Sequence, residues 1–170
     1  MTAHDPQPRL YLDTPRSFDP ADLAARLQAV MDPAIIACVR LSLADDAQED
    51  AWTLAVNHLL PVCHAADVPL LVTDHFRLVA PLGLDGVHLS SGKASVRDVR
   101  DSLGSDRIVG ALAGTSRHDG MVLAEAGCDY VGFGPVGSTG ALGSAALADD
   151  DLFAWWAEMI ETPIVAEGAV

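Results

Sequence analysis

Short apolar segments alternate with amphipathic segments along nearly the whole chain. The apolar runs are four to seven residues long, as expected of strands that are buried on both faces, and the segments between them carry apolar residues at helical spacing. This pattern predicts seven strands, at residues 10–13, 35–41, 69–73, 86–89, 107–113, 130–133 and 163–166. It predicts six intervening helices, at residues 21–31, 48–66, 77–82, 95–103, 117–126 and 149–160.

Residues at the helix ends support these boundaries. Asp19 and Pro20 supply an N-cap and a proline at the first helical position. Three aspartates at residues 149–151 place negative charge at the positive end of a helix dipole. Gly127 suits a left-handed position at a helix C-terminus, because it has no Cβ.

Strict alternation of strands and helices predicts right-handed crossovers and a parallel sheet. A doubly wound open sheet and a (β/α)8 TIM barrel both have this pattern. The short repeating units favour the barrel, and no Gly-x-Gly-x-x-Gly motif follows the first strand. We therefore expect a single α/β barrel domain over residues 1–170. The pattern stops before a last helix, strand and helix, so we expect residues after Val170 or a second copy of the chain to complete the barrel.

Composition excludes several classes of partner. The formal net charge of −14 argues against nucleic acid, which needs a basic surface. No apolar run reaches the roughly 18 residues of a membrane span, and the first residues lack a secretory pattern, so a cytoplasmic location is expected. Cys38, Cys63 and Cys128 stand far apart in apolar contexts and match no metal-binding spacing. They are expected to be reduced core residues.

A glycine-rich loop at residues 134–139 follows the predicted strand at residues 130–133. Ligands of α/β folds bind at the carboxyl ends of the strands, and small residues allow backbone amides to approach an anion. Gly134 and Thr139 are therefore candidate phosphate-binding residues. An ordinary glycine-rich connection between a strand and a helix explains the same segment equally well.

Three motifs resemble thiamine phosphate synthases in their order and spacing. They are Asp-Gly-Val-His-Leu at residues 85–89, Ile-Val-Gly at 108–110 and Gly-Cys-Asp-Tyr-Val-Gly-Phe-Gly-Pro-Val at 127–136. The resemblance implies a (β/α)8 barrel. It also implies a transferase of thiamine biosynthesis that joins hydroxymethylpyrimidine diphosphate to a thiazole phosphate with Mg²⁺ and releases pyrophosphate. Such catalysis depends on stabilising the leaving diphosphate.

The resemblance assigns candidate roles to individual residues. Arg40 matches a cation that reaches the diphosphate, and Asp74 matches a Mg²⁺ ligand, although a helix-capping role for Asp74 is an equal alternative. Gly168 belongs to the family's phosphate site, together with Gly134 and Thr139 of the loop. His88 is either an acid or base at a strand end or a structural hydrogen-bonding residue, and the second reading is favoured.

Several positions depart from the family pattern. Ser42 replaces an arginine, Lys93 stands near the place of a second Mg²⁺ aspartate, and Leu142 replaces a lysine of the loop. Lys93 is the only lysine in the chain, so a shifted alignment cannot restore that cation. Pro135 occupies the place of the histidine used by the related thiazole tautomerases. We expect the standard activity to be weak or absent.

Two other readings of the sequence stay open. One is a catalytically degenerate member of the family that binds a small phosphorylated heterocycle or has a structural role. The other is an unrelated phosphosugar-type barrel enzyme that shares only the fold.

Overall fold

The computed structural model describes residues 7–90, 94–137 and 146–168. Its seven strands follow one another in chain order, β1 to β7, in a parallel sheet. A doubly wound sheet would show a reversal of strand order, and the described strands show none. The expectation of a (β/α)-barrel fold is therefore confirmed. The sequence positions Lys93, Thr139 and Leu142 lie outside the described residues.

The chain divides into two compact units. The first unit contains the residues up to Val72 together with Arg77–Asp85. Its elements are β1 (Leu10–Asp13), α1 (Pro20–Val30), β2 (Ile36–Leu41), α2 (Glu49–Ala65), most of β3 (Leu70–Thr73) and α3 (Val79–Leu82).

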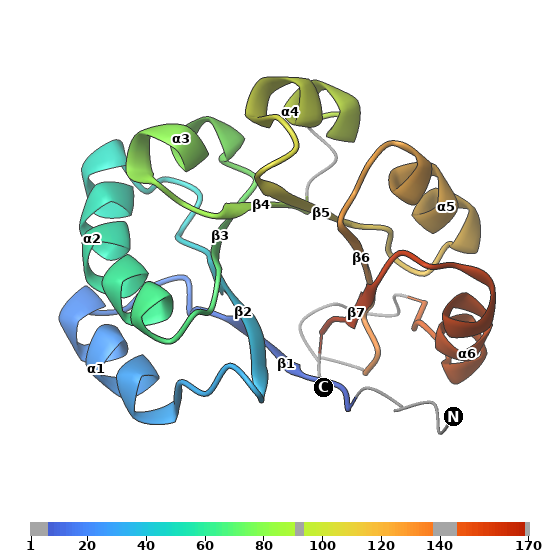
Figure 1. The fold of residues 1–170 in the computed structure, drawn as a ribbon, viewed down its shortest axis with the longest axis horizontal. Helices are drawn as coiled ribbons and strands as arrows, with labels where there is room; N and C mark the ends of the chain where they lie inside the picture. The colour runs from blue at the N-terminus through green and yellow to red at the C-terminus, as the bar shows by residue number, and fades with distance from the viewer. Residues whose placement is uncertain (1–6, 91–93, 138–145, 169–170) are drawn as a thin grey trace. The chain divides into compact units, whose positions relative to one another are not determined.

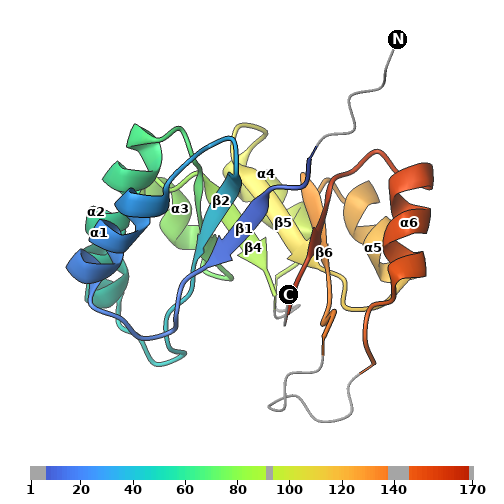
Figure 2. The ribbon, with the colours of Figure 1, turned by 90° about the horizontal axis from the view of Figure 1, so that it is seen from below.

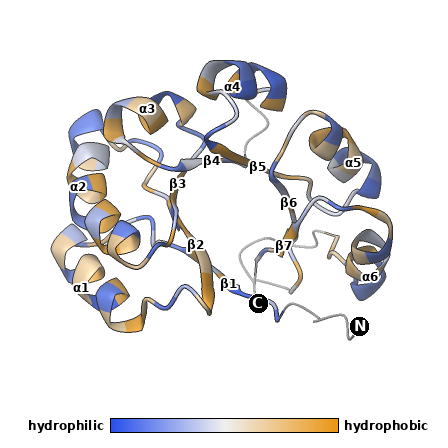
Figure 3. Cartoon of the chain, viewed as in Figure 1, coloured by the Kyte–Doolittle hydropathy of each residue, from blue (hydrophilic) through white to orange (hydrophobic). Residues whose placement is uncertain are grey.

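The helices of the first unit lie on one face of its strands (Figures 1 and 2). Leu27 of α1, Trp52 and Leu59 of α2, and Val39 of β2 are all buried in its core. Helix α1 begins as the sequence predicts, because the Asp19 carboxylate accepts a hydrogen bond of 2.8 Å from the amide of Asp22. The helices show separate hydrophobic and hydrophilic sides, which is the pattern from which they were predicted (Figure 3).

The second unit contains Thr73–Phe76 and the residues from Gly86 onward. Its elements are β4 (Gly86–Leu89), α4 (Val96–Leu103), β5 (Ile108–Leu112), α5 (Arg117–Glu125), β6 (Tyr130–Phe133), α6 (Asp150–Met159) and β7 (Ile164–Ala166). Helices α4, α5 and α6 lie along one face of these strands (Figure 1). The register pairs Val87 with Val109, Ala111 with Val131 and Gly132 with Val165, as expected for neighbouring parallel strands.

The two faces of β6 have different roles because side chains alternate along a strand. Phe133 faces the helices, and its ring centroid lies 5.0 Å from that of the buried Trp156 of α6. A Cβ on Gly120 of α5 would lie 2.5 Å from Cζ of Phe133, so only glycine permits this packing. Tyr130 and Gly132 face the other way, where they meet polar residues of β4 and of the segment after β7.

The observed boundaries differ from the predicted ones by at most one residue at the ends of the strands and of every helix except that predicted at residues 77–82. The predicted helix at residues 77–82 is a 3-10 turn, Phe76–Leu78, followed by the single turn of α3. Leu78 is the N-cap of α3, so Asp74 does not cap that helix. Within the described residues no helix is long and apolar enough to span a membrane.

Candidate functional site

Arg40 lies on β2 opposite Asp13 of β1, with which it is in register. Its Nε and Nη2 atoms donate hydrogen bonds of 3.2 and 2.8 Å to the two carboxylate oxygens of Asp13. The hydroxyl of Ser42 donates a further bond of 3.0 Å to Asp13, and the guanidinium lies over the ring of Tyr11. This bidentate ion pair with Asp13 fixes the guanidinium and neutralises much of its charge. The side chain of Arg40 is only 13% exposed.

Asp74 follows β3 directly and has a left-handed backbone conformation, with φ of 57°. Its amide donates a bond of 2.9 Å to the carbonyl of His88. Both carboxylate oxygens accept hydrogen bonds from Ser90, one of 2.8 Å from the amide and one of 2.7 Å from the hydroxyl. Aspartate tolerates this conformation better than most residues, since its short side chain can bond locally. Asp74 therefore joins the carboxyl ends of β3 and β4.

His88 is fully buried on β4. Its Nδ1 lies 2.8 Å from the hydroxyl of Tyr130, and its Nε2 lies 3.2 Å from Oε1 of Glu167, the residue after β7. The contact with Glu167 has ion-pair distance but not the alignment of a good hydrogen bond. The observed contacts favour the structural reading of His88, because a fully buried imidazole does not reach a ligand in this arrangement.

Two glycines make room for this cluster. A Cβ on Gly110 of β5 would lie 2.0 Å from Cζ of Tyr130, and a Cβ on Gly132 of β6 would lie 2.2 Å from Oε1 of Glu167. Real side chains do not approach so closely, so any larger residue would displace the tyrosine or the glutamate. Gly110 and Gly132 thus leave the space that Tyr130 of β6 and Glu167, after β7, occupy.

The loop after β6 is tied to main-chain carbonyls of the same unit. The amide of Gly134 donates to the carbonyl of Gly114, and the amide of Val136 is shared between the carbonyls of Glu167 and Gly168. The amide of Gly137 also donates to Gly168, at 3.3 Å. The prediction that this loop presents its amides to an anion is therefore not met by these three residues as they stand. Their donors are used within the protein.

A known protein family matches nearly the whole of this chain. The family model for thiamine monophosphate synthase matches residues 10–170. The chain belongs to that family. A thiamine-phosphate synthase of Rhodospirillum centenum is 42% identical over 162 residues, which are 95% of this chain and 78% of the relative. One of Thiobacillus denitrificans is 34% identical over 95% of this chain and 75% of the relative.

A solved structure gives independent support for the fold. A thiamine phosphate pyrophosphorylase from Pyrococcus furiosus superimposes with a TM-score of 0.79, covering 95% of this chain and 75% of that chain. The two sequences are 21% identical, so the likeness bears on the fold alone.

The thiamine monophosphate synthase family implies Mg²⁺, and the described residues do not fit such a site. Hard divalent cations need several oxygen ligands. Asp74 offers a single carboxylate, and nowhere among the described residues do three His, Cys, Asp or Glu side chains gather for a metal. In the observed arrangement the Asp74 carboxylate holds the segment after β3 to Ser90.

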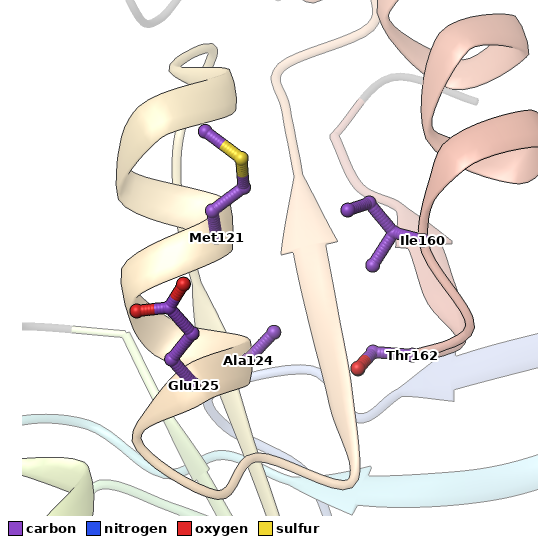
Figure 4. Close-up of a pocket in the computed structure, with 5 residues that line it drawn as sticks. All are labelled: Met121, Ala124, Glu125, Ile160 and Thr162. Atoms are coloured by element: carbon purple, nitrogen blue, oxygen red, sulfur yellow. The ribbon is translucent and has the colours of Figure 1, made fainter.

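A pocket of about 280 Å³ lies elsewhere in the second unit (Figure 4). Met121, Ala124 and Glu125 of α5 line one side, and Ile160 and Thr162, which precede β7, line the other. It lies by the amino end of β7, whereas ligands of this fold class bind at the carboxyl ends. Its one charged side chain is a carboxylate, so it is not an anion site.

The three cysteines are buried, as the sequence predicts. Burial raises the pKa of the thiols of Cys38, Cys63 and Cys128 from 9.0 to about 12. Thiols of this kind are protonated near neutral pH and make poor nucleophiles. They are core residues rather than part of the site.

The residues that sequence reasoning missed are the partners of those it found. Asp13 holds Arg40, Ser90 holds Asp74, and Tyr130 and Glu167 flank His88. Glu167 could have been predicted as a site residue, since it is a carboxylate residue that directly follows an apolar strand. The same holds for Asp13 at the end of β1.

Proposed function

We propose that this chain catalyses the thiamine phosphate synthase reaction slowly, with hydroxymethylpyrimidine diphosphate and a thiazole phosphate as substrates. Support for the reaction class comes from the family match and from the relatives named thiamine-phosphate synthase. In this reaction the bond between the methylene carbon and the diphosphate oxygen breaks. The thiazole nitrogen supplies the electron pair of the new C–N bond, and pyrophosphate leaves with the electrons of the broken bond.

The low rate is inferred from the pairing of Arg40 with both oxygens of Asp13. Negative charge grows on the diphosphate as it leaves, and preformed cations and donors are the main means of stabilising it. A guanidinium that is already neutralised by a carboxylate supplies less of that stabilisation. The carboxylate itself would repel the diphosphate.

The roles of the individual residues follow from their contacts. Arg40 is proposed to bind the diphosphate, with Asp13 and Ser42 fixing its orientation. Asp74 and Ser90 hold the ends of β3 and β4 together. Gly168 is proposed to hold the phosphate of the thiazole, and Gly134 to shape the loop beside it, because the amides of Gly134, Val136 and Gly137 are bonded within the protein. Thr139 is proposed to share that role.

A direct test is the formation of thiamine phosphate by the purified chain and by its Arg40→Ala variant, with Mg²⁺ present. We expect measurable product from the wild type and a further loss of about tenfold in the variant, below the roughly 10²- to 10³-fold effect of removing a fully available charge-stabilising group, because Asp13 already neutralises much of the Arg40 charge. The matched control is Arg16→Ala, because Arg16 also pairs with an aspartate, Asp45, but is largely exposed. Equal rates for the wild type and Arg40→Ala would refute the assignment.

A second candidate function is binding without turnover. It is favoured by the Asp74–Ser90 clamp, which occupies the carboxylate that the family resemblance assigns to Mg²⁺. Calorimetry with thiazole phosphate in the absence of Mg²⁺ separates the candidates. Binding without any product in the assay above would select this second function, and binding with slow product would select the first.

A further inference from the structure

The backbone of Glu167 is bonded on both sides to the segment after β6. Its amide donates a bond of 2.8 Å to the carbonyl of Phe133, and its carbonyl accepts one of 3.1 Å from the amide of Val136. The next carbonyl, that of Gly168, accepts bonds from the amides of Val136 and Gly137. The end of β7 and the loop after β6 therefore hold each other in place.

The side chain of Glu167 provides a third attachment, to β4. Its Oε1 lies 3.2 Å from Nε2 of His88, and the side chain is only 14% exposed. His88 is in turn held by Tyr130, whose hydroxyl oxygen lies 2.8 Å from Nδ1 of the imidazole. A carboxylate removed from water is costly unless it has a partner of opposite charge or a donor, and Nε2 of His88 lies at ion-pair distance from it, although without the alignment of a good hydrogen bond.

Gly168 is the residue whose geometry depends on these attachments. Its φ is 78°, in the left-handed region, and a Cβ placed on it would lie 3.2 Å from Cβ of Pro135. The turn at Gly168 is thus held against the loop after β6. It follows directly from the residue that is anchored to His88.

We propose that Glu167 is a positioning residue for the phosphate group of the ligand. Its carboxylate, held beside His88, sets the turn at Gly168 and the segment from Gly134 to Gly137 before the ligand arrives. Glu167 acts through this backbone and does not touch the ligand. The inference rests on the proposed function, which puts the thiazole phosphate at these segments.

The first test uses the protein without ligand. Amide hydrogen exchange is measured by NMR in the wild type, Glu167→Ala, Glu167→Gln and the matched control Glu161→Ala, an exposed glutamate between α6 and β7. We expect exchange at Val136 and Gly137 to become at least about tenfold faster in Glu167→Ala, as local opening becomes easier. The buried Val131 of β6 should not change. Glutamine keeps an acceptor for His88, so Glu167→Gln should stay within about twofold of the wild type.

The second test uses steady-state kinetics with thiazole phosphate as the varied substrate. Loss of positioning should raise KM about tenfold in Glu167→Ala with kcat within about twofold, because ground state and transition state lose the same contacts. Glu167→Gln should restore the wild-type KM. If Glu167→Ala does not fold, Glu167→Leu replaces it, since it removes the carboxylate while filling the space.

Different results would refute the proposed function and the positioning role of Glu167. A wild type that neither binds nor converts thiazole phosphate refutes the proposed function, and the exchange experiment alone then decides the role of Glu167. Unchanged exchange at Val136 and Gly137 in the folded variants overturns the positioning role. A variant with a lower melting temperature but an unchanged KM for thiazole phosphate also overturns it, because Glu167 would then serve stability alone.

Discussion

Replacing Gly110 by alanine tests how the polar cluster of the second unit is built. The added Cβ would lie 2.0 Å from Cζ and 2.5 Å from the hydroxyl oxygen of Tyr130, whereas ordinary contacts begin near 3.4 Å. The buried ring must therefore move by more than 1 Å, and it then loses its hydrogen bond of 2.8 Å to His88. Overpacking costs about 1–3 kcal/mol and the lost bond about 1 kcal/mol, which gives about 2–4 kcal/mol in total.

The assay is denaturant unfolding followed by tryptophan fluorescence, supported by thermal melting. The expected loss of free energy of unfolding corresponds to a fall in melting temperature of about 4–16 °C for a chain of this size. A control at Gly104, where a Cβ would meet nothing within 4 Å but φ is 74° and ψ is −169°, should show only the strain of a backbone region that glycine alone adopts readily, about 1–3 kcal/mol.

A double-mutant cycle with Tyr130→Ala tests whether the methyl group of Gly110→Ala and the Tyr130 ring compete for the same space. Removal of the ring leaves space for the new methyl group, so Gly110→Ala should cost less in that background, with a coupling energy of about 0.5–3 kcal/mol. Strictly additive losses would show that Gly110 and Tyr130 do not compete for the same space.

Two further predictions concern Arg40 and the cysteines. Asp13→Asn should tighten the binding of inorganic pyrophosphate several-fold by calorimetry, because it removes the charge that neutralises Arg40, and unchanged or weaker binding would contradict the proposed role of the pair. The free energy of unfolding should fall as the pH rises above 9, because the cysteine thiols ionise there in the unfolded chain and only near pH 12 in the folded one. A stability that stays flat between pH 9 and 11 would count against buried thiols of raised pKa.

The fold could be read from the sequence because its strands are short apolar runs separated by amphipathic helices. The bounds of β1, β4 and β6 were predicted to the residue. The largest error in the predicted element bounds is in the segment after β3, where helix-forming and helix-breaking residues alternate. There Pro81 and Gly83 leave room for one 3-10 turn and a single helical turn rather than a continuous helix.

Only part of the site could be predicted from the sequence, because its residues come from several strands. Arg40, Asp74 and His88 are found from local motifs, but their partners come from other strands and depend on register, as Asp13 does on the pairing of β1 with β2. The direction of backbone amides is likewise set by long-range contacts. The small residues at 134–139 fitted an anion-binding loop and an ordinary connection equally well, and in the folded chain the amides of Gly134, Val136 and Gly137 bond to carbonyls of Gly114, Glu167 and Gly168.

We propose that this member of the thiamine monophosphate synthase family turns over the family's substrates slowly. The most direct test is a side-by-side measurement of kcat/KM for thiamine phosphate formation, with Mg²⁺, by this chain and by the 42% identical thiamine-phosphate synthase of Rhodospirillum centenum. We expect product from both, with this chain at least about a hundredfold slower, because the loss of one group that stabilises developing charge already costs about 10²- to 10³-fold. Equal values for the two proteins would contradict it.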